Sequence, residues 1–256
     1  MSWSIKCPFS NVQASSTKPL SIRLSGLGLA AQTSVLTNTD YKLLTKALAL
    51  QLLDDISDLV HTNQTSFIPG RSIFNNIRLA SCIINYVELT ESNGAIVVLD
   101  QEKAYNKIRH DFLWKTLERF HIPNTFIHTV KALYAHAFTH VAINGIFSSP
   151  FQVTRGMHQG DPLSYALFNL AIKPLACRIR GDTSLKGFNI PQLEEKIIIS
   201  LYADDTNLFL SKEDNLDKVH KILEEWCSAS GAKFDIEKTE IIPIGSPAHC
   251  TRMTET

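Results

Sequence analysis

Apolar residues recur at helical spacing through much of the chain, beginning at Asn38. The stretch NTDYKLLTKALALQLLDDISDLV predicts a helix with Asp40 in its first turn. A loop punctuated by Pro and Gly, TSFIPGRSIFNN, separates it from a second predicted helix, IRLASCIINYVELTES, which ends near Asn93 and Gly94. Two more helices are predicted in HDFLWKTLERFHIP and FIHTVKALYAHA. The first half of the chain is therefore predicted to be mostly helical.

Shorter apolar runs with other spacing predict strands. AIVVLD is continuous and contains two valines, which indicates a buried strand that stops at Asp100. THVAING and FQVTRG predict two strands, with a tight turn at Asn144 and Gly145, although IFSSP between them indicates a longer loop. EKIIISLYADDTNLFLS predicts strand, two acids, strand, and AKFDIEKTEIIPIG predicts a final strand or strand pair.

Two helices are predicted around that strand pair. PLSYALFNLAIKPLACRIRG has Pro162 in its first turn, Pro174 at a predicted kink and Gly181 at its end. Ser211 to Asp214 resembles a capping box that starts the other helix, which Gly231 ends. Its predicted core residues are Leu216, Val219, Leu223, Trp226 and Cys227. The element order predicts an α+β fold in which helices back a mainly antiparallel sheet.

Composition and charge limit the kind of protein. The chain has 256 residues, 44% of them apolar, which is typical of a globular protein with one large domain or two lobes. Lys plus Arg and Asp plus Glu both number 25, which argues against a dedicated basic arm for nucleic acid. Residues 1–36 show no period and are predicted to be a poorly ordered leader. The dispersed cysteines, and the lack of a signal peptide or a long apolar run, predict an intracellular protein without a membrane span.

The adjacent acids Asp204 and Asp205 are the candidate chemistry. A pair of aspartates at a turn is ordinarily a solvated loop tip. Here apolar strands flank the pair, and Asp100 ends another buried strand, so three carboxylates could meet at one end of a sheet. Their mutual repulsion would become favourable around Mg²⁺, which prefers carboxylate oxygens and substrate phosphates. Two such ions can stabilise both the attacking and the leaving oxygen in displacement at phosphorus.

Four motifs then carry a family resemblance. VVLDQEKAYNKIRHDFL, RGMHQGDPLSYALFNLAI, YADD and GAKFDIEKTEII occur in this order, and the set resembles the palm of a reverse transcriptase. It is most similar to the non-LTR, LINE-type retrotransposon family, and NTDYKLLTKALALQL with FIPGRSIFNNIRLA resembles the fingers of that family. The resemblance implies a partial fingers region at 37–95, a palm at 96–245 and a tail at 246–256.

The resemblance also implies roles for single residues. Asp100 and Asp204 would hold two Mg²⁺ ions, or Mn²⁺, with Asp205 nearby and the carbonyl oxygen of Gln101 as a further ligand. Tyr105 would exclude a ribose 2′-hydroxyl, and Gln159 would touch the nucleotide or the template. Arg71 would reach the triphosphate or the template, and Lys238 would protonate the leaving pyrophosphate. Gly156 and Gly160 would allow close backbone approach. The implied partners are an RNA template, a DNA primer and a dNTP, and the implied location is nuclear or cytoplasmic.

Departures from the family pattern leave alternatives open. Asn106 stands where the family usually has Asp, an arginine expected upstream of the fingers is missing, and no thumb is expected after Gly245. A truncated element with weak, non-processive binding is the simplest reading. The first hypothesis is an RNA-templated DNA polymerase fragment. The second is an inactive relic with the palm fold and at most weak nucleic-acid binding, and the third is a nuclease or nucleotide cyclase on a similar sheet.

Overall fold

The computed structural model describes residues 38–255, apart from His136, His140, Gly145, His158, Gln159 and Gln192. The predicted leader and Gln159 therefore lie outside the described residues. The helices are α1 (Asn38–Leu59), α2 (Ile73–Leu89), α3 (Ala104–Lys107), α4 (His110–Arg119), α5 (Asn124–Ala135), α6 (Pro162–Gly181), α7 (Leu216–Ser230) and α8 (Pro247–Thr254). The strands are β1 (Gly94–Gln101), β2 (Phe138–Thr139), β3 (Ala142–Ile143), β4 (Ile146–Phe147), β5 (Phe151–Gln152), β6 (Ile199–Tyr202), β7 (Asp205–Ser211) and β8 (Phe234–Ile244).

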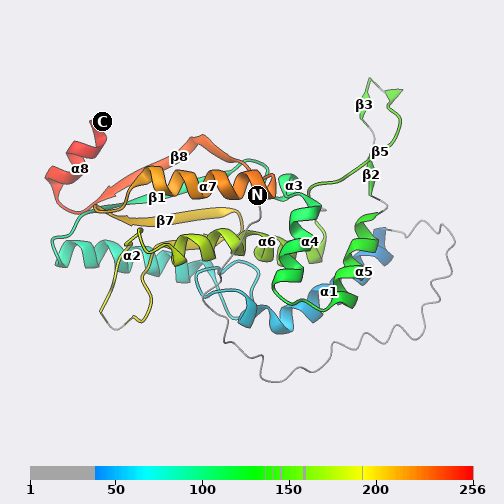
Figure 1. The fold of residues 1–256 in the computed structure, drawn as a ribbon, viewed down its shortest axis with the longest axis horizontal. Coiled ribbons are helices and arrows are strands. Elements are labelled where there is room, and N and C mark those ends of the chain that lie inside the picture. Colours follow the sequence, from blue (N-terminus) through cyan, green and yellow to red (C-terminus); the bar gives the residue numbers. More distant parts are fainter. Residues whose placement is uncertain are drawn as a thin grey trace.

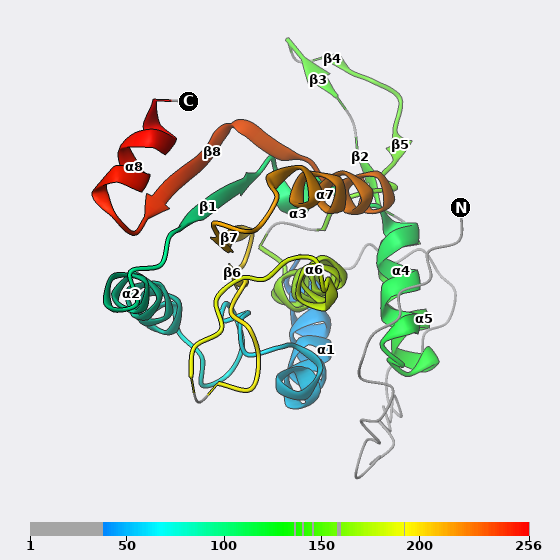
Figure 2. The same ribbon diagram turned by 60° about the vertical axis from the view of Figure 1, so that its left-hand side comes forward.

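One antiparallel sheet with the order β6-β7-β1-β8 forms the centre of the fold (Figure 1). Successive side chains of β1 point to opposite faces. Val97 and Leu99 join the large core formed with α1, α4, α6 and α7, whereas Ile96 packs with α2. In Figure 2, α2 lies on one side of β1 and β7, and α6 and α7 lie on the other. The predicted α+β fold with helices backing an antiparallel sheet is confirmed.

The helix α6 runs through the middle of the large core. Asp161 caps it by accepting a hydrogen bond from the Leu163 N–H at 3.0 Å, and Pro162 occupies the first turn, where its missing N–H costs nothing. Most of its side chains are buried, including Leu167 and Phe168 with no exposed area. The helix therefore supports both the sheet and the segments that carry the candidate site.

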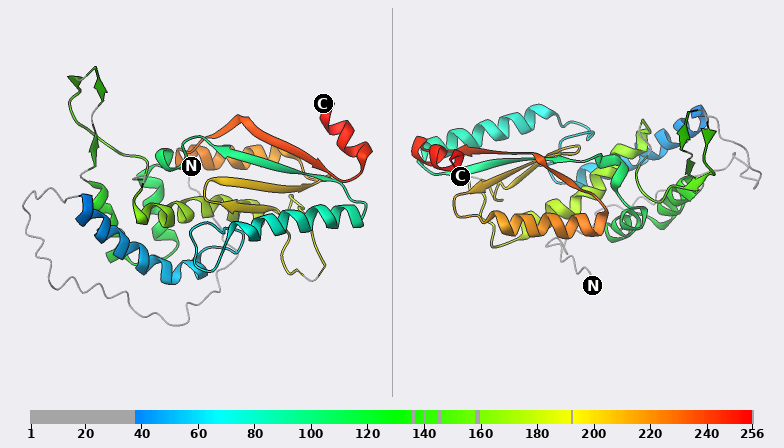
Figure 3. Two further views of the ribbon diagram at one scale, coloured as in Figure 1. Left: turned by 180° about the vertical axis from the view of Figure 1, so that it is seen from behind. Right: turned by 90° about the horizontal axis from the view of Figure 1, so that it is seen from above.

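A hairpin arm, residues 138–152, projects from the body at the end opposite α8 (Figure 3). The two strands predicted here are four short ones, because β2 pairs with β5 at the base and β3 pairs with β4 at the tip. Asn144 adopts the positive φ of 52° expected for the tip, while Gly145 lies outside the described residues. Several apolar side chains of the arm are exposed: Phe138, Val141, Ile143, Ile146, Phe147 and Phe151.

The structure corrects several local predictions. The predicted capping box forms only in part, because the Asp214 carboxylate accepts from the Ser211 N–H at 2.8 Å but α7 begins later, at Leu216, behind its own cap Asn215. The same carboxylate also accepts from the Gly187 N–H at 2.9 Å. Leu216 is 43% exposed rather than in the core. The segment expected to be only a tail contains α8, and α2 begins at Ile73 behind its cap Ser72. None of the described helices is long and apolar enough to cross a membrane.

Candidate active site

The strand register places Asp100 beside the two consecutive acids. The pairing of β1 with β7 ends at Leu99 opposite Thr206, so Asp100 and Asp205 are the next residues of the two strands at that end of the sheet. In the β6–β7 pair Tyr202 lies opposite Asp205, which leaves Ala203 and Asp204 in the turn. The structure therefore brings the three predicted acids to one end of the sheet.

Hydrogen bonding and backbone conformation fix the turn. The Gln101 Nε2 donates to the carbonyl oxygen of Asp204 at 3.2 Å and ties the end of β1 to the turn. Ala203 has a φ of 55°, a left-handed conformation that costs a non-glycine residue about 1–2 kcal/mol. Such local strain persists only where the surrounding structure imposes it, and it is concentrated at functional sites.

The acids repel one another electrostatically. Burial raises the pKa of Asp205, and the charges of Asp204 and Asp100 raise it further. A bound cation would relieve this repulsion, because an opposite charge favours the ionised carboxylate. The accumulation of negative charge at this end of the sheet is therefore consistent with a cation site.

A lysine and a fourth acid approach from β8. Val98 lies opposite Glu240 but Asp100 lies opposite Asp235, so the single residue Leu99 faces the four residues 236–239. This bulge bends β8, as Figure 2 shows, and presents Lys238 to the sheet end. The Lys238 Nζ lies 3.4 Å from Asp100 Oδ2 and 3.6 Å from Asp235 Oδ2, and Asp100 raises the pKa of this lysine. The sequence reading identified Lys238 but missed Asp235, because only the register places it opposite Asp100.

The donor set suits a hard cation. Carboxylate and carbonyl oxygens are the ligands that Mg²⁺ prefers, and the buried Gln101 carries a side-chain Oε1 without a hydrogen-bond partner. The described residues nevertheless contain no group of three or more His, Cys, Asp or Glu side chains arranged to hold a metal. Asp100 is paired with Lys238 in this arrangement, so the acids are neighbours without forming a closed ligand cluster.

Tyr105 stands next to the acids on the segment that follows β1. Its ring packs on Phe168 at a centroid distance of 4.6 Å and meets Tyr165 edge-on at 5.8 Å. Burial raises the pKa of the Tyr105 phenol, and the nearby charge of Asp204 raises it further. The phenol thus lies within electrostatic reach of the turn, although its predicted role in sugar selection stays a prediction.

A backbone contact joins Tyr105 to the segment before α6. The Met157 N–H donates to the Tyr105 carbonyl oxygen at 2.7 Å, and the Gly156 N–H donates to that of Ile108 at 2.7 Å. Gly156 has a φ of +86°, and a Cβ there would lie only 2.9 Å from the Asn106 carbonyl oxygen. Gly156 therefore permits a close approach, as predicted, but to the chain itself. Gly160 also has a positive φ, and no described residue lies within 4 Å of the place of its missing Cβ.

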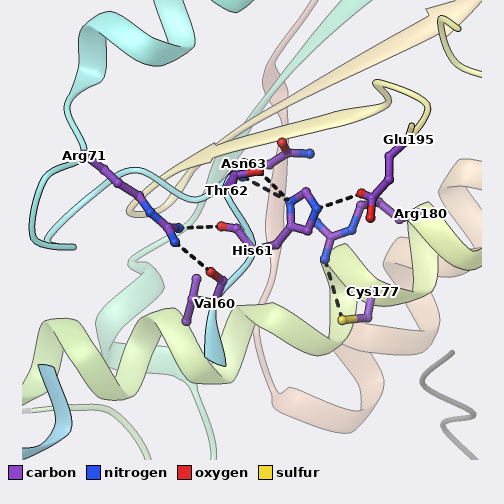
Figure 4. Close-up of polar contacts among 8 residues, drawn as sticks. All are labelled: Val60, His61, Thr62, Asn63, Arg71, Cys177, Arg180 and Glu195. Atoms are coloured by element: carbon purple, nitrogen blue, oxygen red, sulfur yellow. Dashed lines mark hydrogen bonds and ion pairs between the residues drawn. The ribbon is translucent and has the colours of Figure 1, made fainter. Parts of the chain in front are cut away.

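Arg71 is engaged elsewhere (Figure 4). Its guanidinium donates to the backbone carbonyl oxygens of Val60 and His61, as Figure 4 shows. It also donates to those of Ser57 in α1 and Gln64 in the next loop. These bonds satisfy carbonyl groups that a helix end leaves unpaired. In this arrangement Arg71 has a structural role, and contact with triphosphate or template stays a prediction.

The sequence matches a known family. The family described as Reverse transcriptase (RNA-dependent DNA polymerase) matches residues 32–249. The Transposon TX1 uncharacterized 149 kDa protein of Xenopus laevis is 33% identical over 211 residues, which cover 82% of this chain and 16% of that protein. The Pol polyprotein from the retrotransposable element R2DM of Drosophila melanogaster is 26% identical over 190 residues, covering 73% and 18%. The chain therefore spans less than a fifth of the length of these curated relatives.

Solved structures show the same fold. Telomerase from Candida tropicalis in complex with a TWJ fragment of telomeric RNA has a TM-score of 0.56 at 15% identity, covering 81% of this chain and 34% of that chain. The apo telomerase of the same organism, truncated from its C-terminal domain, has a TM-score of 0.57 at 14% identity, covering 82% and 42%. At these identities the likeness establishes the architecture alone, which is that of a palm built on an antiparallel sheet.

Proposed function

Because the chain belongs to the reverse transcriptase (RNA-dependent DNA polymerase) family, with relatives among non-LTR retrotransposon proteins, we propose that it carries out nucleotidyl transfer. The reaction joins a dNTP to the 3′ end of a DNA primer on an RNA template. The observation that supports this proposal best is the adjacency of Asp100 and Asp205 across β1 and β7, with Asp204 in the turn beside them. In this proposal residues 37–95 act as part of the fingers and residues 96–245 as a LINE-type palm.

The acids would bind the catalytic cations. Asp100, Asp204 and Asp205, with the carbonyl oxygen of Gln101, would hold Mg²⁺ or Mn²⁺, whose charge stabilises the attacking and leaving oxygens of phosphoryl transfer. Two such ions are the expected number. For Asp100 to take part, its carboxylate must leave Lys238, which lies 3.4 Å away.

Other residues would select and process the nucleotide. Tyr105, held by its ring contacts with Phe168 and Tyr165, supports the incoming sugar and excludes a 2′-hydroxyl by steric fit. Lys238, released from Asp100, donates a proton to the leaving pyrophosphate, because a positioned ammonium acts as a general acid. Gln159 and Arg71 are the further proposed contacts to nucleotide and template.

Primer extension on poly(rA)/oligo(dT) at low salt with Mg²⁺ tests the proposal. We expect Asp204→Asn to lower extension by at least about a hundredfold, since it removes a charge from the site that stabilises the transition state. Asp55→Asn is the matched control, because Asp55 is exposed on α1 and the substitution removes the same charge. Equal extension by the two variants, or none by the unmodified protein, would contradict the proposal.

A second candidate is a protein with the palm fold and no turnover. Two observations favour it. The described residues contain no preformed cluster of metal ligands, and the Asp100 carboxylate is already paired with Lys238. A cooperative melt that millimolar Mn²⁺ with dNTP leaves unshifted would support it, because a ligand that binds only the folded state raises the melting temperature. Mg²⁺-dependent extension that disappears in Asp204→Asn would exclude it.

A further inference from the structure

A pocket of about 710 Å³ lies between α4, α5 and the segment 152–155, on the helical side of the molecule. Binding sites for small molecules and single nucleotides commonly fall between about 300 and 1,000 Å³. The pocket residues come from two consecutive helices and the segment 152–155, and Gly231 at the end of α7, which is distant in sequence, also lines it. The three carboxylates of the candidate active site are not among its lining residues.

Aromatic side chains form one wall of this pocket. Trp114 is half-buried and meets Tyr134 edge-on at a centroid distance of 5.7 Å. Tyr134 in turn meets His110 edge-on at 5.0 Å, and the His110 Nε2 is 2.8 Å from the Gly156 carbonyl oxygen. Tyr134 is only 3% exposed, so Trp114 is the most accessible indole or phenol of the wall. A rigid aromatic side chain held in this way provides a stacking surface for a nucleobase.

Basic side chains surround the same pocket. Arg109 is paired with Asp111, with its Nε 3.0 Å from Asp111 Oδ1, and Lys131 is paired with Glu118 at 3.0 Å. Arg155 is exposed and forms no ion pair with any described carboxylate. One cation therefore remains available for an anionic group of a ligand, at the edge of the aromatic wall.

The pocket is connected directly to the candidate active site. Arg155 lines the pocket, and two residues later the Met157 N–H bonds to the Tyr105 carbonyl oxygen at 2.7 Å. The intervening Gly156 packs against Asn106 so closely that no Cβ fits. One short backbone segment therefore links the pocket to Tyr105.

We propose that this pocket binds single-stranded nucleic acid, with a base against Trp114 and a phosphate at Arg155. Stacking requires an unpaired base, which a duplex does not expose. Arg155 is the one arginine or lysine without an ion pair among the described residues that line the pocket, and it matches one phosphate. The choice of partner rests on the proposed polymerase function. The pocket would hold an unpaired stretch of template or primer strand outside the metal site.

Quenching of tryptophan fluorescence tests the proposal without metal or dNTP. The protein is titrated with oligouridylate and, in a second arm, with oligothymidylate, which distinguishes RNA from DNA as the source of the strand. All titrations use the Trp3→Phe background, because Trp3 is the third tryptophan of the chain and lies outside the described residues. In this background we expect saturable quenching that Trp114→Phe abolishes, since the remaining Trp226 is 1% exposed. A strand labelled with a fluorophore gives the affinity of every variant by anisotropy.

Substitutions at the pocket and away from it separate the outcomes. Arg155→Glu and Trp114→Ala should each lower the affinity for the strand about tenfold. Arg155→Glu should also reduce, by about one, the slope of log affinity against log salt concentration. Lys221→Glu, an equal charge change at an exposed position of α7, should have little effect. Melting curves confirm that each variant is folded, and Trp114→Phe is the conservative substitute if Trp114→Ala unfolds.

Three results would overturn the pocket assignment: no quenching, equal affinities for Arg155→Glu and Lys221→Glu, or displacement of the strand by an acidic peptide at the same charge concentration. The last would mean that the pocket recognises acidic protein segments. Failure of the polymerase proposal looks different. In that case Asp204→Asn and the unmodified protein bind the strand equally and neither extends a primer.

Discussion

At the scale of single residues, the contact between Lys238 and Asp100 controls what the acids can do. The ammonium group lies between Asp100 and Asp235 and partly neutralises both. A divalent cation that needs the Asp100 oxygens must compete with this ammonium. The bulge in β8 covers residues 236–239 and therefore includes Lys238. The Lys238 ammonium and a bound divalent cation would therefore compete for the Asp100 carboxylate.

We predict that Lys238→Met tightens Mn²⁺ binding about two- to fivefold, the range expected for loss of one exposed competing ion pair. Electron paramagnetic resonance of free Mn²⁺ measures the affinity, and the melting temperature without metal should fall because the acids lose their counter-ion. Lys233→Met is the matched control, since Lys233 pairs with Glu102 at 3.1 Å and has the same 68% side-chain exposure as Lys238. Weaker or unchanged Mn²⁺ binding would show that Lys238 does not compete.

At the scale of elements, the segment between β5 and α6 attaches the long core helix to the residues after β1. Its hydrogen bonds to Tyr105 and Ile108 fix the position of the α3 region. The attachment depends on Gly156, because any side chain there would collide with the Asn106 backbone. Asn106 therefore matters through its backbone, whichever side chain the position carries.

Gly156→Ala and Gly160→Ala form a matched pair that tests this attachment. Both glycines have similar positive φ angles, +86° and +83°, but among the residues that the structure describes only Gly156 has neighbours within reach of a Cβ. We expect Gly160→Ala to lower the free energy of unfolding by about 1–2 kcal/mol, the cost of the left-handed conformation alone. Gly156→Ala should cost clearly more and should also reduce primer extension. Equal losses in urea unfolding would mean that the Gly156 contact relaxes freely.

At the scale of the whole molecule, a polar cluster joins the end of α1 to the segment before β6 (Figure 4). The His61 Nε2 lies 2.8 Å from Glu195 Oε2, and the His61 carbonyl oxygen accepts from Arg71 at 2.6 Å. The neighbouring loop also bonds to the sheet, since the Thr65 N–H donates to the Leu201 carbonyl oxygen at 3.1 Å. These contacts connect the proposed fingers to the proposed palm.

Protonation of His61 should make the stability of this connection sensitive to pH. Burial lowers the pKa of His61 and the nearby Arg180 charge lowers it further, although Glu195 opposes them. In the unfolded chain a histidine titrates near about 6.5, so below that pH the unfolded state binds more protons than the folded state. Stability is therefore lost as the pH falls from about 6.5 through the lower folded-state pKa.

We predict that His61→Gln reduces this loss of stability between neutral pH and pH 5, as measured by urea unfolding at several pH values. His220→Gln is the control, because the His220 side chain is 59% exposed on α7. This substitution also removes one histidine but leaves the contacts of His61 with Glu195 and Arg71 unchanged. Identical pH profiles for the two variants would show that His61 is not the sensitive group.

Local sequence determined the elements that carry the chemistry. Alternating and continuous apolar runs are set by which face a strand buries, so β1, β6 and β7 and the acids at their ends were predictable from neighbours in the chain. The motif order also indicated the family, which the match over residues 32–249 confirms. Cap residues with local bonds, such as Asp161 before α6, were equally readable.

Only the tertiary structure decided how distant residues pair. Asp214 accepts from Lys186 and Gly187 instead of capping the next helix, and Asp235 reaches Lys238 beside Asp100 through an irregular register. Arg71 likewise bonds to the end of α1. Charged and polar groups satisfy their hydrogen bonds with whatever the fold brings near them, and that proximity depends on packing of the whole chain rather than on sequence neighbours.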